Sequence, residues 1–187
     1  RLWNAEVNRD FSDYGMLTHE QLRAKNEYRD FVESITQYLY PDDSSNEGKR
    51  MRLIQEYFLV SAGVQSIVRH FVRSGFNIHE FDKKVAIHIN DTHPALCVAE
   101  LMRMLVDEYE LEWNEAWVIT RNTMAYTNHT IMPEALERWP VDMFKALLPR
   151  IYMIIDEINR RHVEYVKARY PDDVNKLRAM SIIENGE

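Results

Sequence analysis

The sequence predicts an α/β fold in which helices dominate and strands are few and short. Residues 85–89 (Val-Ala-Ile-His-Ile) form an apolar run rich in β-branched side chains, which is typical of a buried strand. Residues 124–126 form a second short apolar segment. Most of the remaining chain shows apolar residues at helical spacing. We therefore expect long helices around a small sheet.

Two helical patterns precede the first expected strand. Residues 18–40 place Leu22, Phe31 and Leu39 at helical spacing, and Pro41 ends the pattern. Residues 41–48 are polar and rich in Asp and Ser, so we expect a loop there. A longer apolar pattern covers residues 49–73 and ends at Ser74-Gly75, after which residues 76–83 form a short connection.

Proline residues and polar turns set the boundaries of the later elements. Asp91 or Thr92 is expected to cap a helix over residues 95–109, with Pro94 in its first turn. Further helices are expected over residues 113–123, from Pro133 to the break at Trp139-Pro140, over 141–148, over 149–170, and from a cap at Asp172 or Asp173 to residue 180.

Composition limits the functional classes. The chain has 187 residues, of which 45% are hydrophobic and 28% charged, as in an ordinary globular protein. Its net charge of −7 argues against a nucleic-acid groove, and no apolar run approaches the ~20 residues that span a membrane. A single cysteine, Cys97, fits a reducing cytoplasm. Histidine spacing predicts no metal site.

Polar residues follow both expected strands. Asp91 and His93 come after the first, and His129 comes after the second. Open α/β sheets bind ligands at the carboxyl ends of their strands, so we expect a pocket there. Tyr126, Glu134 and Glu137 would complete a polar set that suits a hydroxyl-rich ligand. The alternative is that Asp91 and His93 only cap the following helix.

Three motifs together resemble the α-glucan (glycogen/maltodextrin) phosphorylases. They are residues 90–94 (Asn-Asp-Thr-His-Pro), 126–130 (Tyr-Thr-Asn-His-Thr) and 133–140 (Pro-Glu-Ala-Leu-Glu-Arg-Trp-Pro). Residues 39–41, 55–58, 148–150 and 154–159 are similar to that family as well. The resemblance spans essentially the whole chain in order.

This resemblance implies a two-domain, glycosyltransferase-B-type fold with facing α/β domains. The family uses pyridoxal 5′-phosphate and cleaves terminal α-1,4-linked glucose with phosphate, giving glucose 1-phosphate. Residues 1–187 look like a partial amino-terminal domain, with both neighbouring parts of the chain absent. The cofactor would be bound by the absent carboxyl-terminal domain, so the isolated piece is expected to supply one wall of an active site and to be inactive.

The resemblance also implies residue roles. His129 matches the family histidine that holds the glucose 6-hydroxyl, with its ring fixed by a neighbour such as Asp91. Asp91 and His93 match positions beside the anomeric carbon. The same side of the pocket would be lined by Tyr126, Glu134, Ala135 and Glu137.

Residues 42–46, here called the gate segment, match the family's mobile gate over the active-site entrance. Asp43 is in register with the family aspartate, whereas Ser44 replaces an asparagine. Arg69-His70 and the short connection after Gly75 depart from the nucleotide site of the animal enzymes, which argues against activation by AMP. The helix over residues 22–36 matches the one through which family dimers meet, so a homodimer is expected.

Two other functions fit the same residues. The piece could be a folded helical module without a ligand of its own, because half of the pocket would be missing. It could also belong to a different enzyme of the same fold, such as another glycosyltransferase.

Overall fold

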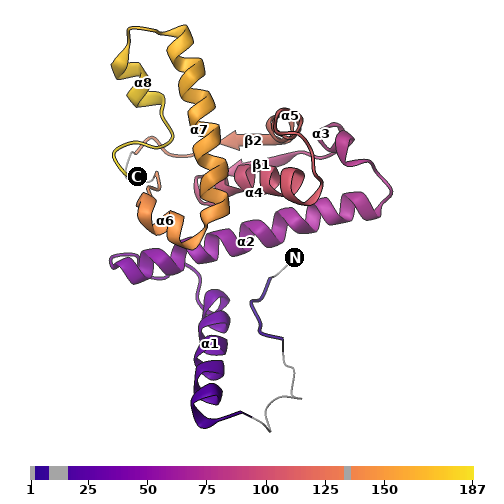
Figure 1. The fold of residues 1–187 in the computed structure, drawn as a ribbon, viewed down its shortest axis with the longest axis vertical. Coiled ribbons are helices and arrows are strands. Elements are labelled where there is room, and N and C mark those ends of the chain that lie inside the picture. The colour runs from indigo at the N-terminus through magenta and orange to yellow at the C-terminus, as the bar shows by residue number, and fades with distance from the viewer. Residues whose placement is uncertain (1–2, 9–16, 133–135) are drawn as a thin grey trace. The chain divides into compact units, whose positions relative to one another are not determined.

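The computed structural model describes residues 3–8, 17–132 and 136–187, and the statements that follow concern those residues (Figure 1). Helices dominate, and two short strands form one sheet. In chain order the elements are α1 (His19–Gln37), α2 (Asn46–Arg73), the 3-10 helix η2 (Ile78–Glu80), α3 (Phe81–Lys84), β1 (Ile87–Asn90), the 3-10 helix η3 (His93–Leu96), α4 (Cys97–Arg103), the π-helix η4 (Met104–Glu108), α5 (Trp113–Thr123), β2 (Met124–Thr127), α6 (Val141–Leu147), α7 (Pro149–Arg169) and α8 (Val174–Met180).

The chain divides into two compact units, residues 1–62 and residues 63–187. The boundary lies within α2. In the first unit, α1 begins with a capping box, in which Thr18 and Gln21 each accept a hydrogen bond from the other's backbone N–H. The hydroxyl of Thr36, near the end of α1, accepts a hydrogen bond from the backbone N–H of Ala5 at 3.1 Å. None of the α1 residues is buried, and Tyr28 and Phe31 are exposed.

Helix α2 starts at Asn46, three residues before the position that the sequence predicts. The hydroxyl of Ser45 accepts a hydrogen bond from the backbone N–H of Gly48 at 3.0 Å, and its carbonyl accepts one from Lys49 at 2.9 Å. Ser45 therefore caps the helix, and the carboxylate of Glu47 lies in the first turn, where the helix dipole favours it. The expected loop over residues 41–48 is correspondingly shorter.

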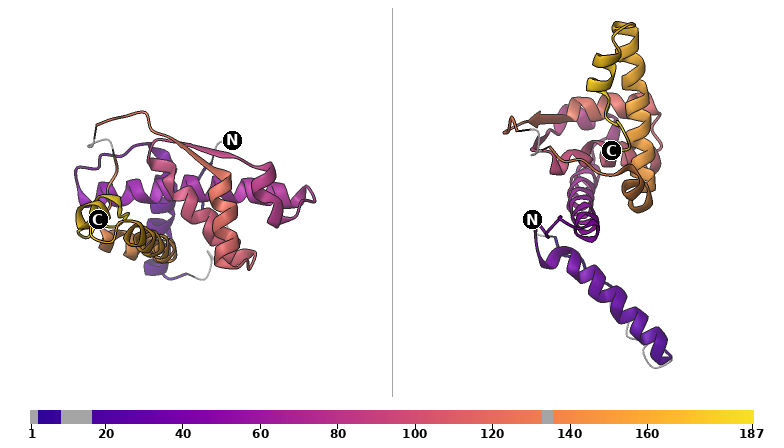
Figure 2. Two further views of the ribbon diagram at one scale, coloured as in Figure 1. Left: turned by 90° about the horizontal axis from the view of Figure 1, so that it is seen from above. Right: turned by 90° about the vertical axis from the view of Figure 1, so that its left-hand side faces the viewer.

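The second unit is built around the sheet. Strands β1 and β2 are parallel, with Ile87 opposite Met124 and Asn90 opposite Thr127. The connection between them contains α4 and α5, which pack against each other, and α4 also packs against α7 (Figures 1 and 2). The core of this unit contains the fully buried side chains of α4, η4 and α7, namely Leu101, Met102, Met104, Leu105, Ile151 and Ile154. These side chains recur at helical spacing, which explains why the sequence pattern predicts the helices.

Several expected elements are confirmed in the second unit. Helix α5 has the expected bounds, α6 and α7 end within one residue of the expected ends, and the carboxylate of Asp173 caps α8 by accepting from Lys176 N–H at 2.8 Å. The connection over residues 76–83 proves to be ordered, because the side chain of Asn77 caps η2 by accepting from His79 N–H.

The helix expected from Pro133 is wrong over the described part of that segment. Residues 136–140 are not helical, whereas residues 133–135 lie outside the described residues. Pro140 disfavours helical geometry at Trp139, and too few residues remain before it for a stable helix to form.

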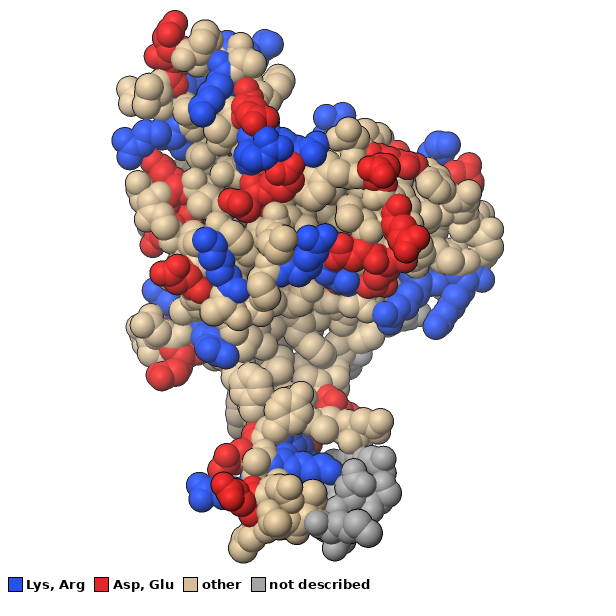
Figure 3. All heavy atoms as spheres, in the orientation of Figure 1, with Lys and Arg blue, Asp and Glu red and all other residues tan. Residues whose placement is uncertain are grey.

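The distribution of charged side chains on the described surface is consistent with the net charge of −7 (Figure 3). On the face shown in Figure 3, acidic and basic side chains are interspersed, with no continuous basic area among the described residues. None of the described helices is both long and apolar enough to span a membrane.

Candidate functional site

The parallel sheet brings the two polar turns to the same edge. Asn90 and Thr127 are opposite each other at the carboxyl ends of β1 and β2. Directly beyond them, the backbone N–H of Asp91 donates to the carbonyl of Thr127 at 3.3 Å. The turn that holds Asp91 and His93 is therefore tied to the start of the turn that holds His129.

Asp91 adopts an unusual backbone conformation, with φ of 62°. This left-handed region is disfavoured for residues with a Cβ atom, although Asp tolerates it better than most. Strained backbone of this kind is concentrated at functional sites, which makes the turn after β1 a candidate site on geometric grounds.

The expected helix cap at this turn is wrong in its detail. Thr92 occupies the N-cap position of η3, but its side chain makes no capping hydrogen bond. Its Oγ1 is buried and has no hydrogen-bond partner among the described residues. The helix begins instead through a backbone bond from Ala95 N–H to the carbonyl of Thr92 at 3.0 Å, which closes a tight 3-10 turn. The hydroxyl of Thr92 is thus a buried polar group without a hydrogen-bond partner among the described residues.

His93 lies between two carboxylates. Its Nε2 is 3.9 Å from Oδ2 of Asp91, and its Nδ1 is 3.7 Å from Oε1 of Glu137. Glu137 is mostly buried, with 13% of its side chain exposed, whereas 39% of the His93 side chain and 43% of the Asp91 side chain are exposed. We call these three residues the His93 cluster. They come from two separate parts of the chain, and the fold brings them together.

Tyr126 and His129 stand on the neighbouring strand and its turn. Both side chains are exposed. The amide of Asn128 donates to the carbonyl of Thr130 at 2.6 Å and accepts from the Thr130 N–H at 3.3 Å, so the turn is held by its own side chains. Among the described residues no hydrogen bond joins His129 to Asp91. Asp91 lies instead 3.9 Å from the ring of His93.

The other expected site residues are distributed differently. Glu134 and Ala135 lie outside the described residues. Asp43 and Ser44 belong to the first unit, where the carboxylate of Asp43 lies 2.6 Å from the guanidinium of Arg52. The backbone N–H of Ser44 donates to Asp42 at 3.0 Å, and this bond together with the Ser44 hydroxyl lowers the pKa of the Asp42 carboxyl.

A cavity of about 610 Å³ adjoins the His93 cluster. Glu137 lies in its wall and also faces His93. Apolar side chains from η3, α6, α7 and the segment before α6 line much of the rest, including Leu96, Trp139, Phe144, Tyr152 and Ile155. Arg138, Arg178, Glu184 and Glu187 also lie in the wall, so the cavity is partly charged, and Glu137 connects it with the polar sheet edge.

The donor set at the sheet edge suits hydroxyl groups. Two carboxylates accept hydrogen bonds, the exposed Tyr126 can donate or accept, and the imidazoles can do either according to tautomer. In the part of the chain that the structure describes, no three His, Cys, Asp or Glu side chains lie close enough to hold a metal ion. The arrangement is suited to binding and orienting a polyol.

Two polar residues escaped the sequence reasoning. Thr92 is predicted only as a cap, and nothing in a single sequence reveals that its hydroxyl is buried and unused. Arg52 carries no sequence prediction, although its spacing to Glu56 on α2 is the i, i+4 spacing of a helical ion pair, and the two groups lie 3.1 Å apart. Its contact with Asp43, nine residues earlier, depends on the fold of the gate segment.

Comparison with known proteins identifies the family. The model of the carbohydrate phosphorylase family matches residues 1–187. The chain belongs to the carbohydrate phosphorylase family. It is 49% identical to the brain form of human glycogen phosphorylase, 47% identical to glycogen phosphorylase from Bacillus subtilis (strain 168), and 48% identical to the muscle form from Ovis aries.

Each of these alignments covers 100% of this chain but only 22–23% of the relative. The chain thus spans less than a quarter of the length of these phosphorylases. The alignment with the human brain form extends over 195 positions, eight more than the residues of this chain. The alignment with the Bacillus subtilis enzyme extends over 186 positions. The alignment with the human enzyme therefore contains at least eight positions that have no counterpart in this chain, whereas the alignment with the bacterial enzyme needs no such positions.

Proposed function

We propose that this chain is part of a glycogen or related α-glucan phosphorylase. The full-length enzyme would transfer the terminal α-1,4-linked glucose of a glucan to inorganic phosphate. The glycosidic C1–O4 bond breaks, a bond from C1 to a phosphate oxygen forms, and the glucan oxygen receives a proton. The products are glucose 1-phosphate and a glucan shorter by one glucose residue.

One observation carries the proposal. In a chain about half identical to glycogen phosphorylases, four of the residues expected to contact glucose, Asp91, His93, Tyr126 and His129, lie at or directly after the carboxyl ends of two paired parallel strands. Two features of this edge do not depend on sequence similarity. The backbone of Asp91 is in the left-handed region, and the hydroxyl of Thr92 has no hydrogen-bond partner among the described residues. Ligand sites in open α/β sheets lie at that edge.

The chain's own residues would bind and orient the sugar. His129 would bind the glucose 6-hydroxyl through one ring nitrogen, in a turn held by Asn128. Asp91 and His93 would lie beside the anomeric carbon, and Tyr126, Glu134, Ala135 and Glu137 would line the same side. Fixing glucose in this way lowers the entropic cost of reaching the transition state. It also permits contacts that strengthen as charge develops at C1.

Pyridoxal 5′-phosphate does not fit the site described above. The cofactor is an anion held through a lysine, whereas the His93 cluster presents two carboxylates. We therefore place the cofactor, together with the residues that bind phosphate, in parts of the enzyme beyond this chain. The chain alone would then lack the groups that activate phosphate, and it would be inactive.

The remaining features concern the whole enzyme. The gate segment would cover the entrance to the active site, with Asp43 and Ser44 near the substrate. Residues 22–36, whose Tyr28 and Phe31 are exposed, would form a homodimer contact. The shorter length relative to the animal enzyme supports an enzyme without AMP activation. A cytoplasmic location fits the single cysteine.

The test uses the full-length enzyme and follows phosphate-dependent release of glucose 1-phosphate from an α-1,4-glucan. We expect release by the wild type and a loss of about 100-fold or more in His129→Ala with the cofactor still bound. His162→Ala, a histidine on α7 outside the site, serves as the control and should retain activity. Absence of phosphate-dependent release from the wild type would refute the reaction, and full activity of His129→Ala would refute the role of that residue.

A further inference from the structure

The gate segment is fastened to the helix that follows it. Nη1 of Arg52, on the second turn of α2, donates to Oδ2 of Asp43 at 2.6 Å. Nε of the same guanidinium donates to Oε1 of Glu56 at 3.1 Å. The Arg52–Glu56 pair is shielded from water, with 23% and 11% of the side chains exposed, whereas 48% of the Asp43 side chain is exposed.

The backbone of the gate segment is folded closely onto the same helix start. A Cβ atom at Gly48 would overlap the carbonyl oxygen of Asp42, so only glycine permits this approach. Asp42 accepts two hydrogen bonds from Ser44, and Ser45 caps α2. The segment therefore has a defined conformation that presents the Asp43 carboxylate to Arg52.

We propose that Arg52 is a positioning residue that holds the Asp43 carboxylate of the gate and neutralises its charge. This inference rests on the proposed function, because the role of the gate at the entrance comes from it. Both the phosphate substrate and glucose 1-phosphate are anions, and they would have to pass the gate segment, which carries Asp42 and Asp43 and is followed directly by Glu47. A free carboxylate there would repel them, whereas a paired one would not.

Arginine suits this task better than lysine does. Its planar guanidinium offers several N–H groups in a fixed fork, so one side chain bonds Asp43 and Glu56 at the same time. Glu56 orients the guanidinium, and the guanidinium orients Asp43. The resulting chain of contacts connects the gate segment to the regular backbone of α2.

The test is a double-mutant cycle in the full-length enzyme with Arg52→Gln, Asp43→Asn and both together. We expect Arg52→Gln to lower kcat/KM for phosphate roughly three- to tenfold. The thermal midpoint should also fall, because the largely buried Glu56 loses its bond to the guanidinium, and by a similar amount with and without Asp43→Asn. When Asp43→Asn is already present, Arg52→Gln should lower kcat/KM no further, because the gate carboxylate that it neutralises is gone. Arg50→Gln, an exposed arginine on the same helix, is the matched control and should leave activity unchanged.

Hydrogen exchange gives a readout independent of activity. In Arg52→Gln the amides of residues 43–49 should exchange several-fold faster, while those of α7 remain unchanged. If Arg52→Gln fails to fold, Arg52→Lys takes its place in the same cycle. Lysine keeps the positive charge but lacks the planar guanidinium that bonds Asp43 and Glu56 together. An equal loss of kcat/KM with and without the Asp43→Asn substitution would overturn the proposal, as would unchanged exchange of the gate amides. If the wild type had no phosphate-dependent activity, the proposed function would be refuted. The exchange rates of the gate amides would then still show whether Arg52 holds the gate segment in place.

Discussion

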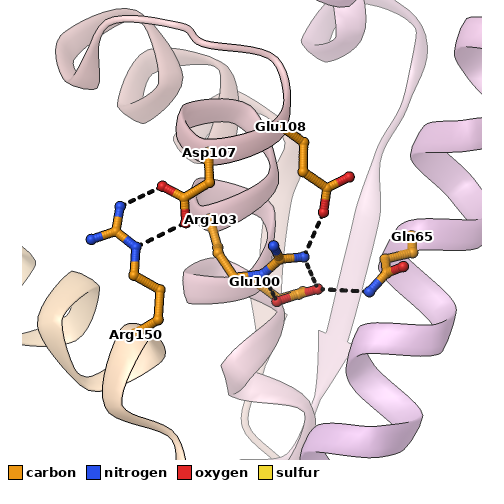
Figure 4. A network of polar contacts seen from close by, with 6 residues as sticks. All are labelled: Gln65, Glu100, Arg103, Asp107, Glu108 and Arg150. Carbon is orange, nitrogen blue, oxygen red and sulfur yellow. Dashed lines mark hydrogen bonds and ion pairs between the residues drawn. The ribbon is translucent and has the colours of Figure 1, made fainter.

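Removing the guanidinium of Arg103 tests how the core of the second unit tolerates a buried charge. The carboxylate of Glu100 is fully buried on α4, and it accepts two hydrogen bonds from Arg103, each at 2.8 Å, and one from Gln65 at 3.3 Å (Figure 4). Arg103 also bonds Glu108 at 2.9 Å. In Arg103→Met the buried carboxylate would lose both strong charged donors and keep the weaker neutral one.

Breaking a buried ion pair by removing one partner costs about 3–5 kcal/mol. Because Gln65 continues to donate and 18% of the Arg103 side chain is exposed, we expect the lower end, about 3 kcal/mol. Native-state hydrogen exchange of α4 amides in the full-length protein measures this directly, and that free energy corresponds to exchange faster by about 100-fold. The double variant Glu100→Gln/Arg103→Met removes the stranded charge and should recover most of the loss.

The matched control for this experiment is Arg121→Met, which removes an exposed arginine from the neighbouring helix α5. It should leave α4 exchange unchanged. Wild-type exchange rates in Arg103→Met would refute the reasoning, because they would mean that the buried carboxylate needs no charged partner. A double variant as unstable as the single one would show that packing of the arginine stem, and not its charge, stabilises α4.

Three further predictions concern other elements. Gly48→Ala should make the gate segment more sensitive to proteolysis, because the added Cβ would clash with the backbone carbonyl of Asp42. Gly63→Ala in the same helix has free space around the added Cβ, so it should stabilise the protein by about 1 kcal/mol in thermal unfolding. The pKa of Glu157 is lowered to about 2 by two neighbouring arginines, so its contribution to stability is present above its ordinary pKa and is lost as pH falls toward 2. Arg160→Gln should raise that pKa in an NMR titration of the carboxyl carbon, and an unchanged value would contradict the assignment of the cause. Burial raises the pKa of the Cys97 thiol to about 11, so a thiol reagent at about pH 8 should modify it only after unfolding; rapid labelling of the native protein would disagree with its burial.

The sequence by itself determined most of the secondary structure. Residues 113–123 and 149–170 carry apolar positions at helical spacing with clear boundaries, and both helices form where the pattern predicts them. The short β-branched run before Asp91 predicts β1 for the same reason. These elements depend on local preferences and on the periodic spacing of apolar residues, both of which can be read along one chain.

The sequence also selected the residues of the candidate site, because polar turns follow both strands and because their motifs resemble one family. It did not determine how these residues are arranged. The segment after Pro133 was the clearest error, since a favourable first turn and helix-forming residues are insufficient when Pro140 follows so closely.

Only the tertiary structure decided which groups meet. His93 faces Glu137, which is distant in the chain, because the turn after β1 lies beside the segment that leads into α6. Asp91 adopts φ of 62° because the turn must leave the sheet while its N–H still bonds the next strand. Arg52 reaches Asp43 because Gly48 allows the backbone of the gate segment to approach α2. Local preferences act over a few residues and can be read from the sequence. These contacts result instead from packing between segments that are far apart in the chain or that fold back on themselves. The pattern of a single sequence does not specify such packing.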